Sequence, residues 1–213
     1  MPRQSILSYI NQLHRPIFTT HELTVLSGKS QSNVVQALNF LEKQGLIFKI
    51  YRGIWAEAGN ERLSPNTVIP YLFPRQRAYV SFISALHLHG IIEQIPQEIT
   101  LASTGHTRVI RTRIGTFSVH RIAPLFFDGF DWYEGKGSFF IAGPEKALVD
   151  SLYLSACKGK RFGYFPELYF PKSFSFKKAK AWAQKIPNSK ISSCAQKRLM
   201  ELFKVNRACH RHI

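Results

Sequence analysis

The chain has 213 residues, of which 45% are hydrophobic, so it holds enough apolar material for one large or two small folded cores. The 29 Lys/Arg against 13 Asp/Glu give a formal charge of +16, which favours a polyanionic partner such as nucleic acid, an anionic membrane surface or an acidic protein. No apolar run reaches the ~18 residues of a membrane-spanning helix, no signal-peptide core is visible, and three cysteines make no disulfide framework. We therefore expect a cytoplasmic protein.

The positive charge is unevenly distributed along the chain. Residues 1–60 hold six Lys/Arg and three Asp/Glu, a net +3, and residues 61–155 hold nine and eight, a net +1. Residues 156–213 hold fourteen and two, a net +12. The basic C-terminal segment must therefore be considered separately from any motif near the N-terminus.

Two short helices are expected before residue 30. Residues 3–14 place apolar side chains at helical spacing and are followed by Pro16, which ends the helix. Thr20 is expected to cap a second helix over residues 21–26. Residues 27–29 form a tight turn that leads to a third helix.

The stretch from Ser30 to Gly45 predicts that third helix. Val34, Leu38 and Leu41 fall on one side at a period of 3.6 residues, and small polar residues fall on the other. The hydroxyl of Ser30 can accept from an N–H group of the first turn. Gly45 can end the helix because glycine adopts the left-handed conformation at little cost.

A basic β-hairpin is expected directly after this helix. Residues 46–51 are rich in β-formers, Arg52-Gly53 is a turn signal, and residues 54–56 can return as the second strand. Two helices, a turn, a third helix and a hairpin are the layout of a winged helix-turn-helix domain, which we assign to residues 1–60.

The polar side of the third helix suits DNA recognition. A helix that enters the major groove needs short polar side chains at its N-terminus, and Asn or Gln can pair bidentately with adenine. Lysines and arginines on the turn and hairpin would contact phosphates. The alternatives are a solvated polar face without a ligand, or a winged helix that binds protein. The residues expected to bind DNA are Lys29, Ser30, Gln31, Ser32, Asn33, Gln36, Lys43, Lys49 and Arg52.

A second domain is expected over residues 61–213, and the boundary is placed within the proline-rich stretch 60–74, near residue 65. The fold class is thus α+β, with an N-terminal winged helix-turn-helix followed by a mixed α/β C-terminal domain. The expected elements are a helix over 75–90, a strand over 99–102, a hairpin over 108–113 and 116–122, a strand over 139–142, a helix beginning at Gly143-Pro144, and a basic helical C-terminal segment with helices over 177–185 and 194–205.

Two stretches of this second domain resemble the AbiEi family of antitoxins, which belong to abortive-infection (type IV) toxin–antitoxin systems of phage defence. They are YVSFISALHLHGIIEQIPQEITLAS (79–103) and FFIAGPEKALVDSLYL (139–154), with SALHLHG and PEKALVD the most specific parts. The resemblance extends over about residues 3–155. It implies a bacterial protein that represses its own operon by binding inverted repeats. It also implies that the second domain opposes a nucleotidyltransferase toxin encoded alongside. Antitoxins of this type do not simply wrap the toxin.

The sequence offers no clear catalytic or metal-binding constellation. His87 and His89 flank one residue of a predicted helix, so they point in different directions. Glu145 and Asp150 are five apart, about 140° around a helix, and are expected to serve in capping and surface solvation. The terminal CHRH segment (209–212) lacks a spaced partner pair for a metal. We therefore expect no enzyme, metal or cofactor.

The basic segment from residue 158 onward has two interpretations. Basic residues among aromatic ones can grip single-stranded nucleic acid by charge and stacking, which makes RNA a candidate partner. Alternatively, the aromatic side chains fill a core and the lysines form its solvated face, and we favour this second interpretation.

The sequence therefore predicts an antitoxin and autorepressor that binds operator DNA and counteracts a nucleotidyltransferase toxin. One alternative is a stand-alone winged-helix transcription factor whose second domain senses a ligand or forms oligomers. Another is a nucleic-acid-modifying enzyme with an unrecognised site.

Overall fold

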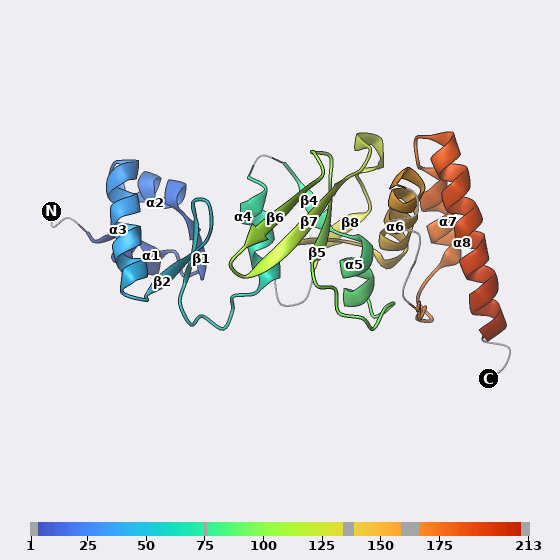
Figure 1. The fold of residues 1–213 in the computed structure, drawn as a ribbon, viewed down its shortest axis with the longest axis horizontal. Helices are drawn as coiled ribbons and strands as arrows, with labels where there is room; N and C mark the ends of the chain where they lie inside the picture. Colours follow the sequence, from blue (N-terminus) through green and yellow to red (C-terminus); the bar gives the residue numbers. More distant parts are fainter. Residues whose placement is uncertain (1–3, 75, 134–138, 159–166, 210–213) are drawn as a thin grey trace. The chain divides into compact units, whose positions relative to one another are not determined.

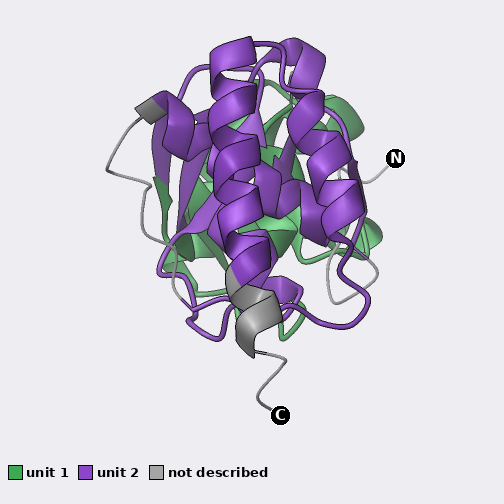
Figure 2. Cartoon of the chain, turned by 90° about the vertical axis from the view of Figure 1, so that its right-hand side faces the viewer, with its two compact units in different colours: residues 1–74, 111–115 green, residues 75–110, 116–213 purple. Residues whose placement is uncertain are grey.

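A computed structural model describes residues 4–74, 76–133, 139–158 and 167–209 of the chain (Figure 1). Helices and strands are mixed, and the strands form two separate sheets, which confirms the α+β class. The chain divides into two compact units, one of residues 1–74 with 111–115 and one of residues 75–110 with 116–213 (Figure 2). Within the described ranges, no helix is long and apolar enough to cross a membrane.

The first unit contains a three-stranded antiparallel sheet of order β1-β3-β2 and three helices ahead of its hairpin. Its core includes an apolar cluster that contains Phe18, Leu38 and Trp55, all at most 1% exposed. The elements are α1 (Ile6–Gln12), β1 (Ile17–Thr19), α2 (Thr20–Ser27), α3 (Gln31–Lys43), β2 (Ile47–Tyr51), β3 (Ile54–Glu57), the 3-10 helix η1 (Pro65–Val68) and α4 (Ile69–Leu72).

The cap of α2 differs from the expectation by one residue. Thr19, not Thr20, is the N-cap, and its hydroxyl accepts from the backbone N–H of Glu22 at 3.2 Å. The Glu22 carboxylate in turn accepts from the backbone N–H of Thr19 at 2.8 Å, which completes a capping box. The prediction of Thr20 was wrong because it neglected the glutamate three residues after Thr19, the spacing that this motif requires.

The predictions for α3 and the hairpin are confirmed. Ser30 caps α3 by accepting from the backbone N–H of Asn33 at 3.3 Å, and the apolar side of the helix is buried. Gly45 follows the helix with φ +74°, and Gly53 in the hairpin turn has φ +70°. Both glycines lie in the left-handed region that other residues rarely adopt.

The second unit is built on a six-stranded mixed sheet of order β6-β7-β5-β4-β9-β8. Strands β4 and β9 pair parallel, as do β5 and β7, whereas β4–β5 and β8–β9 are antiparallel. Helix α6 packs against α5, α7 and α8 (Figure 1). The elements are β4 (Ala78–Val80), α5 (Phe82–Leu88), β5 (Ile99–Ser103), β6 (Arg108–Thr112), β7 (Gly115–Arg121), the 3-10 helix η2 (Pro124–Phe126), β8 (Phe130–Trp132), β9 (Phe140–Ala142), α6 (Pro144–Lys158), α7 (Phe176–Gln184) and α8 (Ser189–Cys209).

The prediction of a single helix over residues 75–90 was wrong. Residues 78–80 form the buried strand β4 between β5 and β9, and among the described residues 76–90 only 82–88 are helical. A short, fully buried strand is continuously apolar, so its sequence cannot be distinguished from a buried helix by periodicity. The expected strands over 99–102 and 139–142, the hairpin, and the start of α6 are confirmed to within about two residues.

The basic C-terminal segment forms α7 and α8, as expected, although α8 is longer than predicted. Four phenylalanines pack against one another with ring centroids 4.7–5.1 Å apart. They are Phe170, Phe174, Phe176 and Phe203. Their mutual packing agrees with the interpretation that aromatic side chains build a core here. Residues 159–166, where three further aromatic residues lie, fall outside the described ranges.

Candidate functional site

The polar face of α3 is exposed on the first unit. Ser30 occupies the N-cap, and the first turn of the helix follows it with backbone N–H groups that have no acceptor inside the helix. Nine residues were predicted to bind DNA, and all belong to the first unit. The eight exposed ones are Ser30, Gln31, Ser32, Asn33, Gln36, Lys43, Lys49 and Arg52.

Lys29, the ninth, is half-buried, and its Nζ donates to the backbone oxygen of Gln4 at 2.9 Å. On the hairpin, the Lys49 ammonium lies 5.4 Å from the centre of the buried Trp55 ring, and Arg52 occupies the turn. The structure therefore brings a polar helix end and a basic hairpin into one unit.

Sequence reasoning missed a further arginine beside the hairpin. Residues 111–115 belong to the first unit, and the backbone N–H of Arg113 donates to the oxygen of Ile50 in β2 at 3.1 Å. The Arg113 guanidinium lies 5.1 Å from the Phe48 ring centre and 3.7 Å from the Glu42 carboxylate. Because 111–115 is distant from β2 in sequence, no local pattern could have placed it there.

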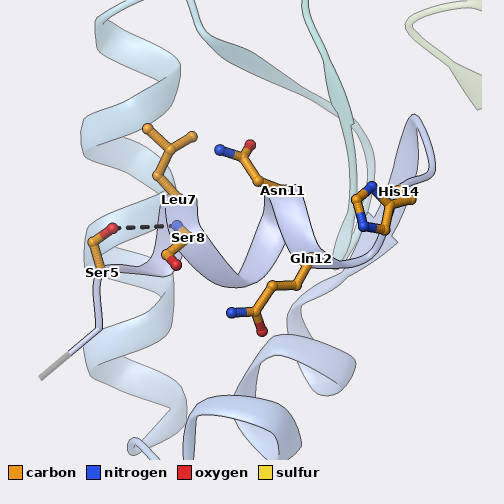
Figure 3. A pocket seen from close by; sticks show the side chains of 6 residues that line it. All are labelled: Ser5, Leu7, Ser8, Asn11, Gln12 and His14. Carbon is orange, nitrogen blue, oxygen red and sulfur yellow. Dashed lines mark hydrogen bonds between the residues drawn. The ribbon is translucent and has the colours of Figure 1, made fainter. Parts of the chain in front are cut away.

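A hollow of about 410 Å³ lies along α1 (Figure 3). It is lined by side chains of α1 and its two ends, among them the amides of Asn11 and Gln12. The Ser5 hydroxyl accepts from the backbone N–H of Ser8 at 3.2 Å and so caps this helix. The lining also includes Leu7 and the His14 imidazole, so the hollow presents both polar and apolar groups.

The second unit contains a buried polar cluster of four residues. Lys146 and Asp150, one turn apart on α6, form an ion pair whose side chains are 1% and 0% exposed. The Asp150 carboxylate also accepts from the hydroxyls of Tyr79 at 3.0 Å and Ser81 at 2.7 Å. The Lys146 ammonium donates to the Tyr79 oxygen at 3.0 Å. The cluster thus joins β4 and the start of α5 to α6.

The expectation that Glu145 and Asp150 serve surface solvation is wrong. Both are buried, Glu145 at 8% exposure, where its carboxylate accepts from the backbone N–H of Ser175 at 2.9 Å. The two acids do point to different partners, as their helical spacing predicted. The signal that was overlooked is Lys146, four residues before Asp150, since that spacing places opposite charges side by side on a helix.

Burial dominates the electrostatics of the cluster. It lowers the pKa of Lys146 and raises the pKa of Asp150, although the attraction between the two charges opposes both shifts. Burial and the nearby Asp150 carboxylate raise the pKa of Tyr79 well above its usual value of 10.0. The Lys146 ammonium also lies 3.8 Å from the Phe126 ring centre.

The cluster is buried, and its four polar side chains are paired with one another, so they join β4 and the start of α5 to α6. Phe82 is the first residue of α5 and follows β4 after one residue. Its φ of +56° lies in the left-handed region, which is strained for a bulky side chain. Ser81, just before it, directs its hydroxyl to Asp150 rather than to the end of α5. Residues 79–103 and 139–154 are therefore joined through these four side chains.

The histidines have separate partners, as their spacing predicted. The Nδ1 atom of His87 lies 3.3 Å from the oxygen of Ile92, and the Nε2 atom of His89 lies 2.7 Å from the oxygen of Ala142. Among the described residues, no three His, Cys, Asp or Glu side chains are grouped to hold a metal ion. The terminal CHRH segment lies outside the residues whose side chains are described.

Comparison of the chain with protein-family models and with curated proteins gives no match in either case.

Proposed function

We propose that the protein is a cytoplasmic antitoxin that also represses its own operon. In this proposal the first unit is a winged helix-turn-helix domain that binds operator DNA, and the second unit counteracts a nucleotidyltransferase toxin encoded alongside. The observation that carries the DNA-binding part is the exposed polar N-terminal half of α3, with Asn33 and Gln36, in the same unit as the basic β2–β3 hairpin.

The geometry of α3 supports insertion into the major groove. Asn33 and Gln36 are one turn apart on the exposed side, so both amides can reach base edges from one helix. The N-terminal amides of α3 can also hold a phosphate. Lys49 and Arg52 on the hairpin would contact DNA phosphates. Such contacts determine the affinity and register of the complex rather than its sequence preference.

The antitoxin part of the proposal rests on the resemblance of residues 79–103 and 139–154 to the AbiEi family. The buried cluster supports it indirectly, because Tyr79 and Ser81 from one stretch meet Lys146 and Asp150 from the other. Both stretches thus specify the same packed core. In this role the second unit acts without chemistry of its own, and the toxin is opposed functionally rather than through an obligatory stable complex.

An experiment with two readouts tests the proposal in the cognate bacterium. The full chain is expressed with a reporter fused to its own promoter and, separately, with the neighbouring nucleotidyltransferase. We expect repression of the reporter and restored growth. Repression of the reporter without protection from the nucleotidyltransferase would favour the stand-alone transcription factor. The absence of both repression and protection would contradict the proposal.

A further inference from the structure

A hollow of about 620 Å³ lies at the β8 end of the six-stranded sheet in the second unit. Its lining combines three aromatic side chains with two carboxylates. Phe130, Trp132 and Tyr133 come from β8 and the residue after it, and Asp128 and Asp131 come from the same stretch. The sequence signal is the alternation FDGFDWY over residues 127–133, in which acidic and aromatic residues are interleaved.

Trp132 presents a large free surface to this hollow. The side chain is 55% exposed, although its ring packs against Phe140 with centroids 4.2 Å apart. In the sheet order β8 is an outermost strand, paired only with β9 among the described strands. An exposed tryptophan supported from one side by another ring is a surface on which a flat or cationic group can stack.

The charged side chains among the described residues of the lining are both acidic. The protein contains only three aspartates, of which Asp128 and Asp131 line the hollow and Asp150 is buried. The described residues of the lining include no lysine or arginine, whereas the chain carries a net charge of +16. The Asp131 carboxylate accepts from the backbone N–H of Trp132 at 2.8 Å, which fixes one acid beside the exposed ring.

We propose that this hollow binds an arginine side chain from a basic segment of a partner protein. The carboxylates supply charge-assisted acceptors for a guanidinium, and the aromatic faces supply cation–π contacts. A nucleic-acid backbone is disfavoured, because its phosphates would be repelled by Asp128 and Asp131, and no described residue of the lining offers a lysine or arginine to offset that repulsion. This protein-binding site goes beyond the proposed DNA-binding and antitoxin roles and does not depend on α3.

The hollow also includes residues of both stretches that carry the resemblance. His89, at the end of α5, and Ala142, at the end of β9, line it, and the His89 Nε2 atom lies 2.7 Å from the Ala142 oxygen. One wall of the hollow therefore joins the C-terminal end of α5 to the end of β9.

Fluorine NMR of the full chain labelled with 5-fluorotryptophan tests the proposal. The chain has three tryptophans, so Trp132→Phe assigns the signal of interest. The probe is an acetylated, amidated Gly-Arg-Gly-Arg-Gly peptide, and the matched peptide replaces both arginines by neutral citrulline. We expect the arginine peptide to shift the Trp132 signal saturably and the citrulline peptide to leave it unchanged.

The variant Asp131→Asn isolates the charge. Asparagine retains an oxygen that can accept from the Trp132 N–H group, so the local backbone is preserved while the negative charge is removed. We expect its dissociation constant for the arginine peptide to rise about tenfold, with an unchanged thermal midpoint. Glu98→Gln, an exposed acid of the same unit outside the lining, is the control and should bind as the wild type does.

Three outcomes would overturn the proposal. Equal binding of the citrulline peptide would show an apolar surface without charge selection. A Trp132 signal unmoved by millimolar arginine peptide would show that no such site exists. A saturable shift with a short single-stranded oligonucleotide, and not with the peptide, would assign the hollow to nucleic acid instead.

Discussion

Lys146 and Asp150, one turn apart on α6, form an ion pair at 1% and 0% side-chain exposure. Tyr79 and Ser81, which complete the arrangement, lie 71 and 69 residues away from Asp150 in sequence. The hydrogen bonds from Tyr79 and Ser81 to Asp150 therefore constrain the fold of the second unit over a long distance in sequence. Removing one charge of the pair costs more stability than removing both, because the remaining charge is then buried and uncompensated.

Asp150→Asn is expected to destabilise the second unit by about 3–5 kcal/mol, since it leaves the Lys146 ammonium buried without a counter-charge. Chemical unfolding followed by tryptophan fluorescence measures the change. The double variant Lys146→Met/Asp150→Leu should be less destabilised than Asp150→Asn, because it removes both charges. Lys178→Met, at an exposed lysine of α7, is the control and should change stability by less than about 0.5 kcal/mol. A double variant as unstable as the single one would refute this account.

Gly129→Ala is expected to destabilise the second unit by more than about 1 kcal/mol. Gly129 has φ +77°, and an added Cβ would lie 2.6 Å from the Trp182 ring and 3.2 Å from Cγ of Lys146. Gly90→Ala is a matched control, because Gly90 has φ +68° but nothing within 4 Å of the added carbon. The difference between the two thermal midpoints isolates the steric conflict from the backbone strain. Equal midpoints would show that Trp182 does not restrict this position.

The Glu22 capping box predicts a pH-dependent contribution to the stability of the first unit. Partial burial opposes ionisation, but hydrogen bonds from Thr19 and Arg15 prevail and hold the pKa of Glu22 below its usual value of 4.5. A carboxyl with a lowered pKa stabilises the folded state above its unfolded pKa, and this stabilisation is lost as the pH falls through the folded value. The stability difference between wild type and Glu22→Gln should therefore be constant above about pH 5 and shrink below pH 4.5. A difference that grows on acidification would contradict this assignment.

Local chemistry explains which parts of the fold were predictable from sequence. The α3 helix and its hairpin follow from Ser30, Gly45, Gly53 and a stripe of apolar residues, all of which act within a few residues. Strand β4 was missed because it is defined by pairing on both edges with β5 and β9, which lie far along the chain. The same distance in sequence hid the cluster around Asp150 and the position of residues 111–115 beside β2.

The hairpin lysine and arginine are expected to contact DNA phosphates. Lys49→Ala or Arg52→Ala should weaken binding to all DNA sequences similarly and reduce the slope of log affinity against log salt by about 1 for each phosphate that the variant no longer neutralises. Fluorescence anisotropy over a salt series, with operator and unrelated duplexes, measures this. A variant that weakened the operator alone would instead place the residue at base edges.

The central claim is that α3 recognises operator DNA. The operator affinity of two double variants, matched in residue type, tests this claim most directly. Asn33→Ala/Gln36→Ala alters the exposed face of α3, and Asn11→Ala/Gln12→Ala alters the same two residue types on the exposed face of α1. The measurement is the dissociation constant of each full-length variant for its own promoter DNA at fixed salt, with protection from the toxin assayed in parallel.

We expect the α3 variant to lose about 1–3 kcal/mol of operator affinity for each bidentate base interaction that it removes, to keep its affinity for unrelated DNA, and still to protect cells from the toxin. The α1 variant should bind operator as the wild type does. Unchanged operator affinity in the α3 variant would contradict the assignment of α3 as the recognition helix.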